Sequence, residues 1–167
     1  MQLIDTRIVH KSNELQGYRY GRDFIWSERS RVPSLWMALL VGMVGSIIQA
    51  LLSFRFIVHL ALRFLPKPGM GPSEDVMNKG FMKIRYWLQA KGSNDQEVIL
   101  RGGLTAMGGD PGYKLTACML TESALCIALE EEKLPKNFGV ITPSVAFGNT
   151  LRERLGKKDF HFYVDKE

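Results

Sequence analysis

The chain has 167 residues, the length of one domain with a sizeable core. Hydrophobic residues make up 46% and charged residues 23%, which are ordinary values for a globular protein. The first residues, MQLIDTRIVHK, are polar and charged, so they form neither a signal peptide nor an Arg-rich transit peptide.

The net charge of +5 is concentrated in one interval. No Asp or Glu occurs between Glu28 and Glu74, and the five basic residues of that interval account for the whole excess: Arg29, Arg31, Arg55, Arg63 and Lys67. Because these cations surround the most apolar part of the sequence, they favour an anionic membrane surface over nucleic acid as a partner.

Residues 1–26 alternate loosely between polar and apolar positions, and several are β-branched or aromatic. A turn signal, Ser12-Asn13-Glu14, separates the two halves of this stretch. The pattern predicts a strand pair over residues 1–30 that belongs to the sheet.

Val32 to Phe54 contains 23 residues without a charge, and a bilayer crossing needs about 20. Gly42 and Gly45 could break such a helix, and both flanks are basic, so a hairpin in one leaflet or a buried helix pair stays open. We expect lipid contact at Trp36, Leu39 and Leu40.

Arg55, His59 and Arg63 recur every four residues, which places them on one stripe of a helix. This pattern predicts an amphipathic helix in a membrane interface, with Arg55 and Arg63 at the head groups. An ordinary surface helix with one solvated stripe is the alternative. We expect a hydrophobic helical segment over residues 31–68.

Residues 69–167 are expected to form the remaining domain. Lys79 to Lys91 and Gln96 to Met107 alternate and flank the turn Gly92-Ser93-Asn94-Asp95, which predicts a β-hairpin. Helices are predicted at Leu115–Leu129 and Ser144–Leu155, and a strand at Phe160–Val164. This order predicts an α+β fold, with a mostly antiparallel sheet packed against a buried central helix.

The helix at Leu115–Leu129 is apolar on every side, as buried helices are. Its Cys118 and Cys126 are eight residues apart, a rise of about 12 Å that is too long for a disulfide. Free thiols suit a reducing, intracellular compartment. Glu122 is a lone carboxylate in this helix, and burial would require a partner, for which we expect an arginine.

The segments GGDPGYKLTACMLTESALCIAL, GVITPSVAFGNTLRERL and PKPGMGPSEDVMNKGFMKIRYWLQAKG resemble the C-terminal region of the saccharopine dehydrogenase-like oxidoreductases. The resemblance covers about Gly69 to Leu155. Animal members are associated with lipid droplets and membranes, and larger relatives include bacterial enoyl reductases of lipid biosynthesis. Family members begin with a nucleotide-binding half, which this chain lacks, so the resemblance implies NAD(P) for the full-length protein and no cofactor in this chain.

Sequence motifs for chemistry are absent. No GxGxxG occurs, the glycines at 103 and 108 lack the lysine of a phosphate loop, and His10, His59 and His161 form no zinc pattern with the cysteines. No G-x-S-x-G elbow occurs either. We therefore predict no catalytic residue and no metal ligand in this chain.

The turn GGDPGY is the one candidate binding site. Paired glycines allow close approach of a ligand, and a helix N-terminus favours anions, so the substrate-binding candidates are Gly109, Asp110, Tyr113 and Lys114. We favour the simpler interpretation, in which Asp110 caps the helix and the glycines form the turn.

Two functions compete. The resemblance implies the C-terminal substrate and packing domain of a saccharopine dehydrogenase-like oxidoreductase, which is lipid-associated and not catalytic alone. The alternative is a membrane or lipid-droplet anchoring module without enzymatic activity. The expected partners are the nucleotide-binding domain of the same protein and a lipid or membrane surface, with a homo-oligomer kept open and nucleic acid excluded.

Overall fold

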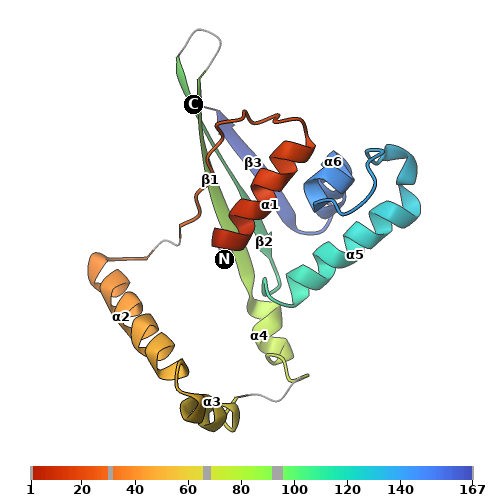
Figure 1. Ribbon diagram of the computed structural model, residues 1–167. Helices are drawn as coiled ribbons and strands as arrows, with labels where there is room; N and C mark the ends of the chain where they lie inside the picture. Colours follow the sequence, from red (N-terminus) through yellow and green to blue (C-terminus); the bar gives the residue numbers. More distant parts are fainter. Residues whose placement is uncertain (1, 30–31, 66–68, 92–95, 167) are drawn as a thin grey trace. The chain divides into compact units, whose positions relative to one another are not determined.

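The computed structural model describes residues 2–29, 32–65, 69–91 and 96–166. Within these ranges it contains six α-helices, one short 3-10 helix (η1, Glu131–Lys133) and a sheet of three strands. Figure 1 shows the chain with its elements labelled. The structure confirms the predicted α+β class.

The sheet is antiparallel, and its strands lie in the order β1-β2-β3. β1 (Phe81–Lys91) and β2 (Glu97–Met107) form the predicted hairpin, in which Phe81 pairs with Met107. β3 (Phe160–Lys166) pairs with the other side of β2. The turn predicted at 92–95 lies outside the described residues.

The core lies where two helices cover one end of this sheet. α5 (Lys114–Leu129) and α6 (Pro143–Leu155) contribute Leu115 and Leu155, which pack against Leu104, Ala106 and Phe160 of the strands. Both helices and β3 were predicted, because Pro143 opens α6 at its first turn and β3 alternates. Burial of these apolar side chains holds the helices on the sheet.

α5 is buried on one side only. Leu115, Glu122 and Cys126 lie on the buried side, whereas Leu120, Ile127 and Leu129 stay exposed. The apolar residues on every side of the helix predicted full burial, but the described residues of the chain cover only one side of α5.

The predicted strand pair over residues 1–30 is wrong. The chain instead forms helix α1 (Gln2–Leu15), which is followed by a turn and an extended segment. Gly17 has a φ of 69°, and the N–H groups of Gly17 and Tyr18 donate to the carbonyls of Glu14 and Asn13. This left-handed glycine cap terminates a helix, so Ser12-Asn13-Glu14 is its last turn and not a loop.

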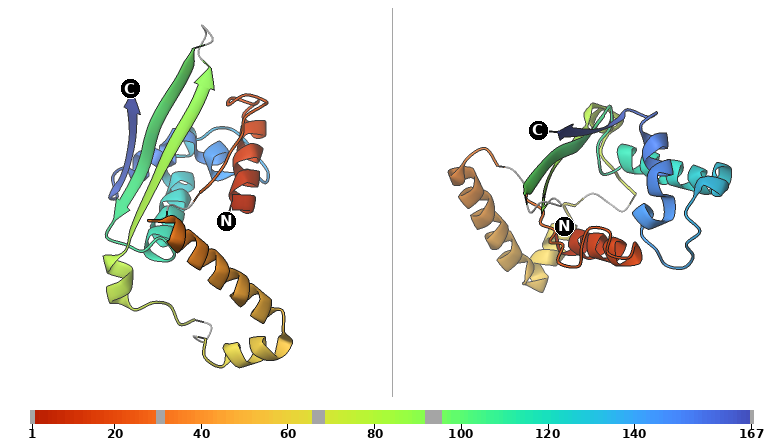
Figure 2. Two further views of the ribbon diagram at one scale, coloured as in Figure 1. Left: turned by 90° about the vertical axis from the view of Figure 1, so that its left-hand side faces the viewer. Right: turned by 90° about the horizontal axis from the view of Figure 1, so that it is seen from above.

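The chain divides into two compact units. Unit 1 comprises Met1–Thr6 and Ile25–Gly71 and holds α2 (Leu35–Leu52) and α3 (Arg55–Leu62). Unit 2 comprises Arg7–Phe24 and Pro72–Glu167 and holds the sheet, α4 (Glu74–Lys79), α5 and α6. Figure 2 shows the three strands of unit 2 side by side in its left view and from above in its right view.

Candidate functional site

The GGDPGY turn is organised by the carboxylate of Asp110. Its two oxygens accept hydrogen bonds from the backbone N–H groups of Gly112, Tyr113 and Lys114 at 3.0, 2.9 and 3.0 Å. These bonds, above all the one from Lys114, hold the pKa of Asp110 below its usual range. Asp110 is not the N-cap residue that the sequence predicted, because α5 begins at Lys114 and Tyr113 holds the cap position. Its carboxylate instead closes the turn before the helix and also accepts from the N–H of Lys114, the first residue of α5.

The same turn packs against α4 and the start of β1. The N–H groups of Asp110 and Gly109 donate to the carbonyls of Met77 and Gly80, at 2.8 and 3.0 Å. The amine of Lys114 donates to the side chain of Asn78 at 2.7 Å. These contacts hold the turn against α4 and the start of β1, in addition to the bonds that Asp110 makes within the turn.

The predicted substrate-binding residues thus lie together at one end of the sheet. The N–H groups that precede and begin α5 are where an anion would bind, but the Asp110 carboxylate accepts from three of them. The geometry therefore accounts for the turn by these hydrogen bonds and by packing. Substrate binding by Gly109, Asp110, Tyr113 and Lys114 stays a prediction.

Glu122 has the arginine partner that its burial required. The guanidinium of Arg154, on α6, donates to one Glu122 oxygen and also to Glu130, at 2.8 and 2.7 Å. The side chain of Glu122 is 6% exposed and that of Arg154 is 18% exposed. The pair ties α5 to α6, which is a structural role.

Glu130 completes this ion-pair group. Lys133 donates to its second oxygen at 2.8 Å, and Arg154 donates to the first. The hydrogen bond from Lys133, followed by that from Arg154, lowers the pKa of Glu130 to about 2. The carboxylate therefore stays ionised at every physiological pH.

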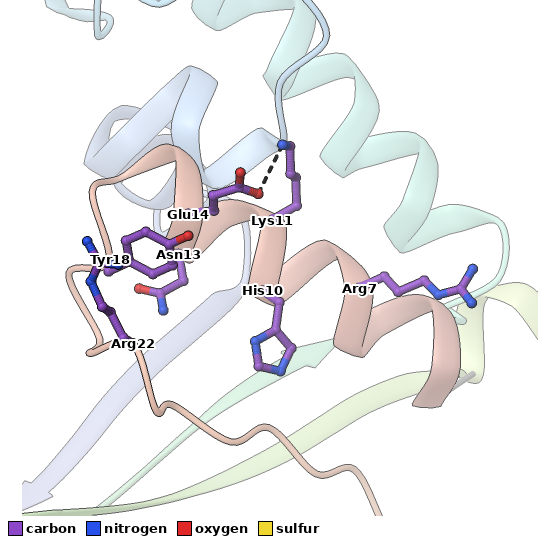
Figure 3. Close-up of a pocket in the computed structure, with 7 residues that line it drawn as sticks. All are labelled: Arg7, His10, Lys11, Asn13, Glu14, Tyr18 and Arg22. Carbon is purple, nitrogen blue, oxygen red and sulfur yellow. Dashed lines mark hydrogen bonds and ion pairs between the residues drawn. The ribbon is translucent and has the colours of Figure 1, made fainter.

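A shallow depression of about 360 Å³ lies on α1 and the turn that follows it. Figure 3 shows its lining residues: Arg7, His10, Lys11, Asn13, Glu14, Tyr18 and Arg22. Arg22 lies over the ring of Tyr18, at 4.8 Å from its centroid, and Lys11 is paired with Glu14 at 3.0 Å. Arg7 extends away from the other drawn side chains along the helix.

The turn beside this depression is held by a buried side chain. Asn13 is almost fully buried, donates to the carbonyl of Gly21 at 2.8 Å and accepts from the N–H of Tyr20 at 2.9 Å. Tyr18 has a φ of 60°, which is costly for a residue with a Cβ. Asn13 thus fixes the backbone of the turn that carries Tyr18 and Arg22.

Sequence reasoning missed this depression because it assigned strands there. The available signal was the spacing of Arg7, Lys11 and Glu14, which places them on one face of a helix, together with the capping Gly17.

α2 is long and apolar enough to cross a membrane, with a mean hydropathy of 2.1 over its 18 residues, none of them buried. It is one continuous helix begun by Ser34, whose hydroxyl accepts from the N–H of Met37 at 3.2 Å. The five predicted lipid-contact residues are all exposed: Trp36, Leu39, Leu40, Arg55 and Arg63. Their contact with lipid stays a prediction.

Within the described ranges, no three His, Cys, Asp or Glu side chains gather in a way that could hold a metal ion. Cys118 and Cys126 are free thiols, and burial raises the pKa of Cys126.

The chain matches curated proteins in alignments 158 positions long, which cover 90% of the chain. A provisionally named trans-acting enoyl reductase of Mycobacterium tuberculosis is 38% identical, and the trans-acting enoyl reductases of Mycobacterium bovis and Mycobacterium ulcerans are 33% and 34% identical. The chain is similar to trans-acting enoyl reductases. It spans 36% of the length of these relatives. No family model and no solved structure matches it.

These relatives overturn the recognition drawn from the sequence. They are named trans-acting enoyl reductases, so the assignment to the saccharopine dehydrogenase-like oxidoreductases is wrong. The predicted role as the C-terminal domain of such an oxidoreductase is therefore wrong as well. The alternative role, a lipid-droplet or membrane anchoring module without enzymatic activity, is wrong for the same reason, because the relatives are named as enzymes.

Proposed function

We propose that this chain is part of an enzyme that reduces the carbon–carbon double bond of an enoyl group. The observation that carries the proposal is the identity of 33–38% to trans-acting enoyl reductases over 90% of the chain. In such a reduction a hydride adds to the β-carbon and a proton to the α-carbon, so the double bond becomes saturated and the hydride donor is oxidised.

The hydride donor in our proposal is a reduced nicotinamide nucleotide, bound outside this chain. The sequence has no GxGxxG, and the N–H groups at the start of α5 are already bonded by Asp110. The role left to this chain is to hold the enoyl substrate or its carrier.

The depression on α1 is the described surface best suited to a carrier that bears a phosphate. Arg22 supplies a cation that lies over the ring of Tyr18, and the lining also contains His10 and Lys11, whose amine is paired with Glu14. Arginine binds phosphate through a planar set of donors, and stacking on Tyr18 holds that plane in one orientation.

A chimera tests the proposed function directly. The aligned segment of the 38% identical M. tuberculosis relative would be replaced by the matching segment of this chain. We expect the chimera to reduce a 2-enoyl thioester of coenzyme A, measured as loss of NADPH absorbance and gain of the saturated thioester. A folded chimera with no activity, beside an active parent, would contradict the proposal.

The same chimera tests the depression. Arg22→Glu is expected to raise the KM for the coenzyme A thioester at least tenfold and to leave kcat within a factor of about three. Arg19→Glu, on the same turn but outside the depression, is the matched control. If both variants raised the KM equally, the effect would come from the overall charge of the surface, and phosphate binding in the depression would be contradicted.

A further inference from the structure

α5 carries a second apolar face on the side opposite its buried one. The face consists of Tyr113, Ala117, Leu120, Ala124 and Ile127, called the α5 seam below, and all five residues are exposed. Tyr113, Leu120 and Ile127 are 55%, 71% and 60% exposed. Spacings of four, three, four and three residues are those of a helix that packs along another helix.

The outward side of a surface helix is normally polar. α5 has one charged residue between Lys114 and Glu130, and that residue is Glu122, which lies on the buried side. The seam is flanked by Thr116 and Thr121 and by no charged residue. Figures 1 and 2 show α6 and the sheet on one side of α5 and no other described element of unit 2 on the opposite side.

The seam is complementary to itself when a second copy runs antiparallel. In the symmetric alignment Leu120 of one copy lies opposite Ala124 of the other, and Ile127 lies opposite Ala117. At these two levels a large side chain faces a small one, so the two helices can approach closely there. Self-complementarity of this kind is what a two-fold interface requires.

The charges at the two ends of α5 support the same alignment. Lys114 lies at the N-terminus and Glu130–Glu132 lie at the C-terminus, which is the unfavourable arrangement for the dipole of a single helix. In an antiparallel pair Lys114 of one copy lies near the exposed Glu131 of the other, whereas Glu130 is already paired with Lys133 and Arg154 within its own chain. The second copy therefore supplies the opposite charge at each end.

We propose that the α5 seam is the interface of a homodimer, in which α5 packs antiparallel against α5 of a second copy of this chain. The proposal is independent of the enoyl reductase function, because it rests on the exposure, spacing and charge of α5 alone.

Sedimentation velocity of the full chain over a range of concentrations tests the interface. We expect the wild type to reach twice the 18.9 kDa mass of one chain. Leu120→Glu should weaken the dimer at least tenfold, since it places two carboxylates in the apolar contact. Leu120 is mostly exposed, so the variant should keep its thermal midpoint, which circular dichroism checks.

Two variants control for association through other surfaces. Val140→Glu changes a fully exposed apolar residue in a loop of unit 2, and Leu40→Glu changes an exposed residue of α2. Neither should alter the dimer. A wild type that stays monomeric, or a dimer that survives Leu120→Glu, would overturn the proposal, and so would a dimer lost with Leu40→Glu.

Charge exchange tests the antiparallel direction. Glu131→Lys and Lys114→Glu should each weaken the dimer about threefold or more, whereas the double variant should regain the wild-type dissociation constant. A double variant weaker than either single one would contradict the antiparallel alignment.

Discussion

At the residue scale, Arg154 holds two carboxylates, one of which is buried. Replacing it by methionine keeps the aliphatic stem and leaves the buried Glu122 with the longer ion pair to Lys158, at 3.9 Å, in place of the guanidinium. Breaking a buried pair from one side costs about 3–5 kcal/mol. We expect Arg154→Met to lower the free energy of unfolding by about 3 kcal/mol, measured by urea denaturation.

Arg152→Met is the control for this change, because Arg152 is an exposed arginine on the same helix. It should stay within about 0.5 kcal/mol of the wild type. If both variants lost the same free energy of unfolding, the loss would come from replacing any arginine of α6 and not from breaking the ion pair.

The low pKa of Glu130 makes stability depend on pH in the acid range. Its folded pKa is about 2, below the ordinary value of 4.5, because Lys133 and Arg154 bond the ionised form. The contribution of Glu130 is therefore complete above about pH 4.5 and is lost as the pH falls toward 2.

The measurement is the free energy of unfolding from pH 6 to pH 2, compared between the wild type and Glu130→Gln. We expect the stability of the variant to fall less steeply between pH 4.5 and 2, since it has no proton to bind at this position. Parallel curves would show that Glu130 has an ordinary pKa.

The Asp110 carboxylate can be tested as the acceptor of the turn without reference to any ligand. Asp110→Ala removes the acceptor of three backbone N–H groups and should lower the urea midpoint, whereas Asp110→Asn keeps an acceptor oxygen and should lower it less. If alanine leaves the midpoint unchanged, the carboxylate is not needed for the turn, and a ligand role becomes the better explanation.

Reasoning from single residues reached the correct chemistry at Glu122 and Asp110. The cost of a buried charge required a cation at Glu122, and the carboxylate of Asp110 does bond backbone N–H groups before α5, although the N-cap position itself is Tyr113. The sequence could not identify Arg154 as the partner of Glu122, because the two residues are 32 positions apart and the sequence alone does not say which helices pack together. The depression on α1 was missed because its element was assigned wrongly.

At the element scale, the contact between the GGDPGY turn and β1 depends on the small size of Gly80. A Cβ added at Gly80 would lie 2.4 Å from backbone atoms of Asp110, which is closer than atoms can approach. Gly80 has a φ of −68°, so alanine is disfavoured there by contact and not by backbone conformation.

We expect Gly80→Ala to destabilise unit 2 by about 1–3 kcal/mol, the usual cost of forcing extra volume into a packed site. Gly42→Ala in α2 is the matched control, because a Cβ there meets nothing within 4 Å and alanine favours a helix interior. It should not destabilise the protein. A neutral Gly80→Ala would mean that the turn does not lie against β1 as closely as the structure has it.

Elements with a strong periodic pattern were predicted correctly. The hairpin alternates over two runs of eleven residues, α5 is apolar over most of its length, and Pro143 marks the start of α6. α1 was not predicted because its first ten residues fit alternation as well as a helical period. The deciding feature is Gly17, whose role as a helix cap depends on a conformation that the pattern does not reveal.

At the scale of the whole molecule, the two units differ in how they bury apolar surface. Unit 2 has the core cluster around Leu104, Ala106 and Phe160, whereas α2 and α3 contain no buried residue. Helices of this length gain most of their stability from packing, so an unpacked helix is expected to open readily in water.

Native-state hydrogen exchange of the full chain in water tests this difference. We expect the amides at the centre of β2 to exchange with the free energy of global unfolding, and those of α2 to exchange through local opening at least a hundredfold faster. Phe160→Ala, which removes a buried ring at a cost of about 3–5 kcal/mol, should accelerate exchange in β2 and leave α2 unchanged. If the amides of α2 exchanged as slowly as those of β2, and Phe160→Ala accelerated both, α2 would be covered and would unfold together with unit 2.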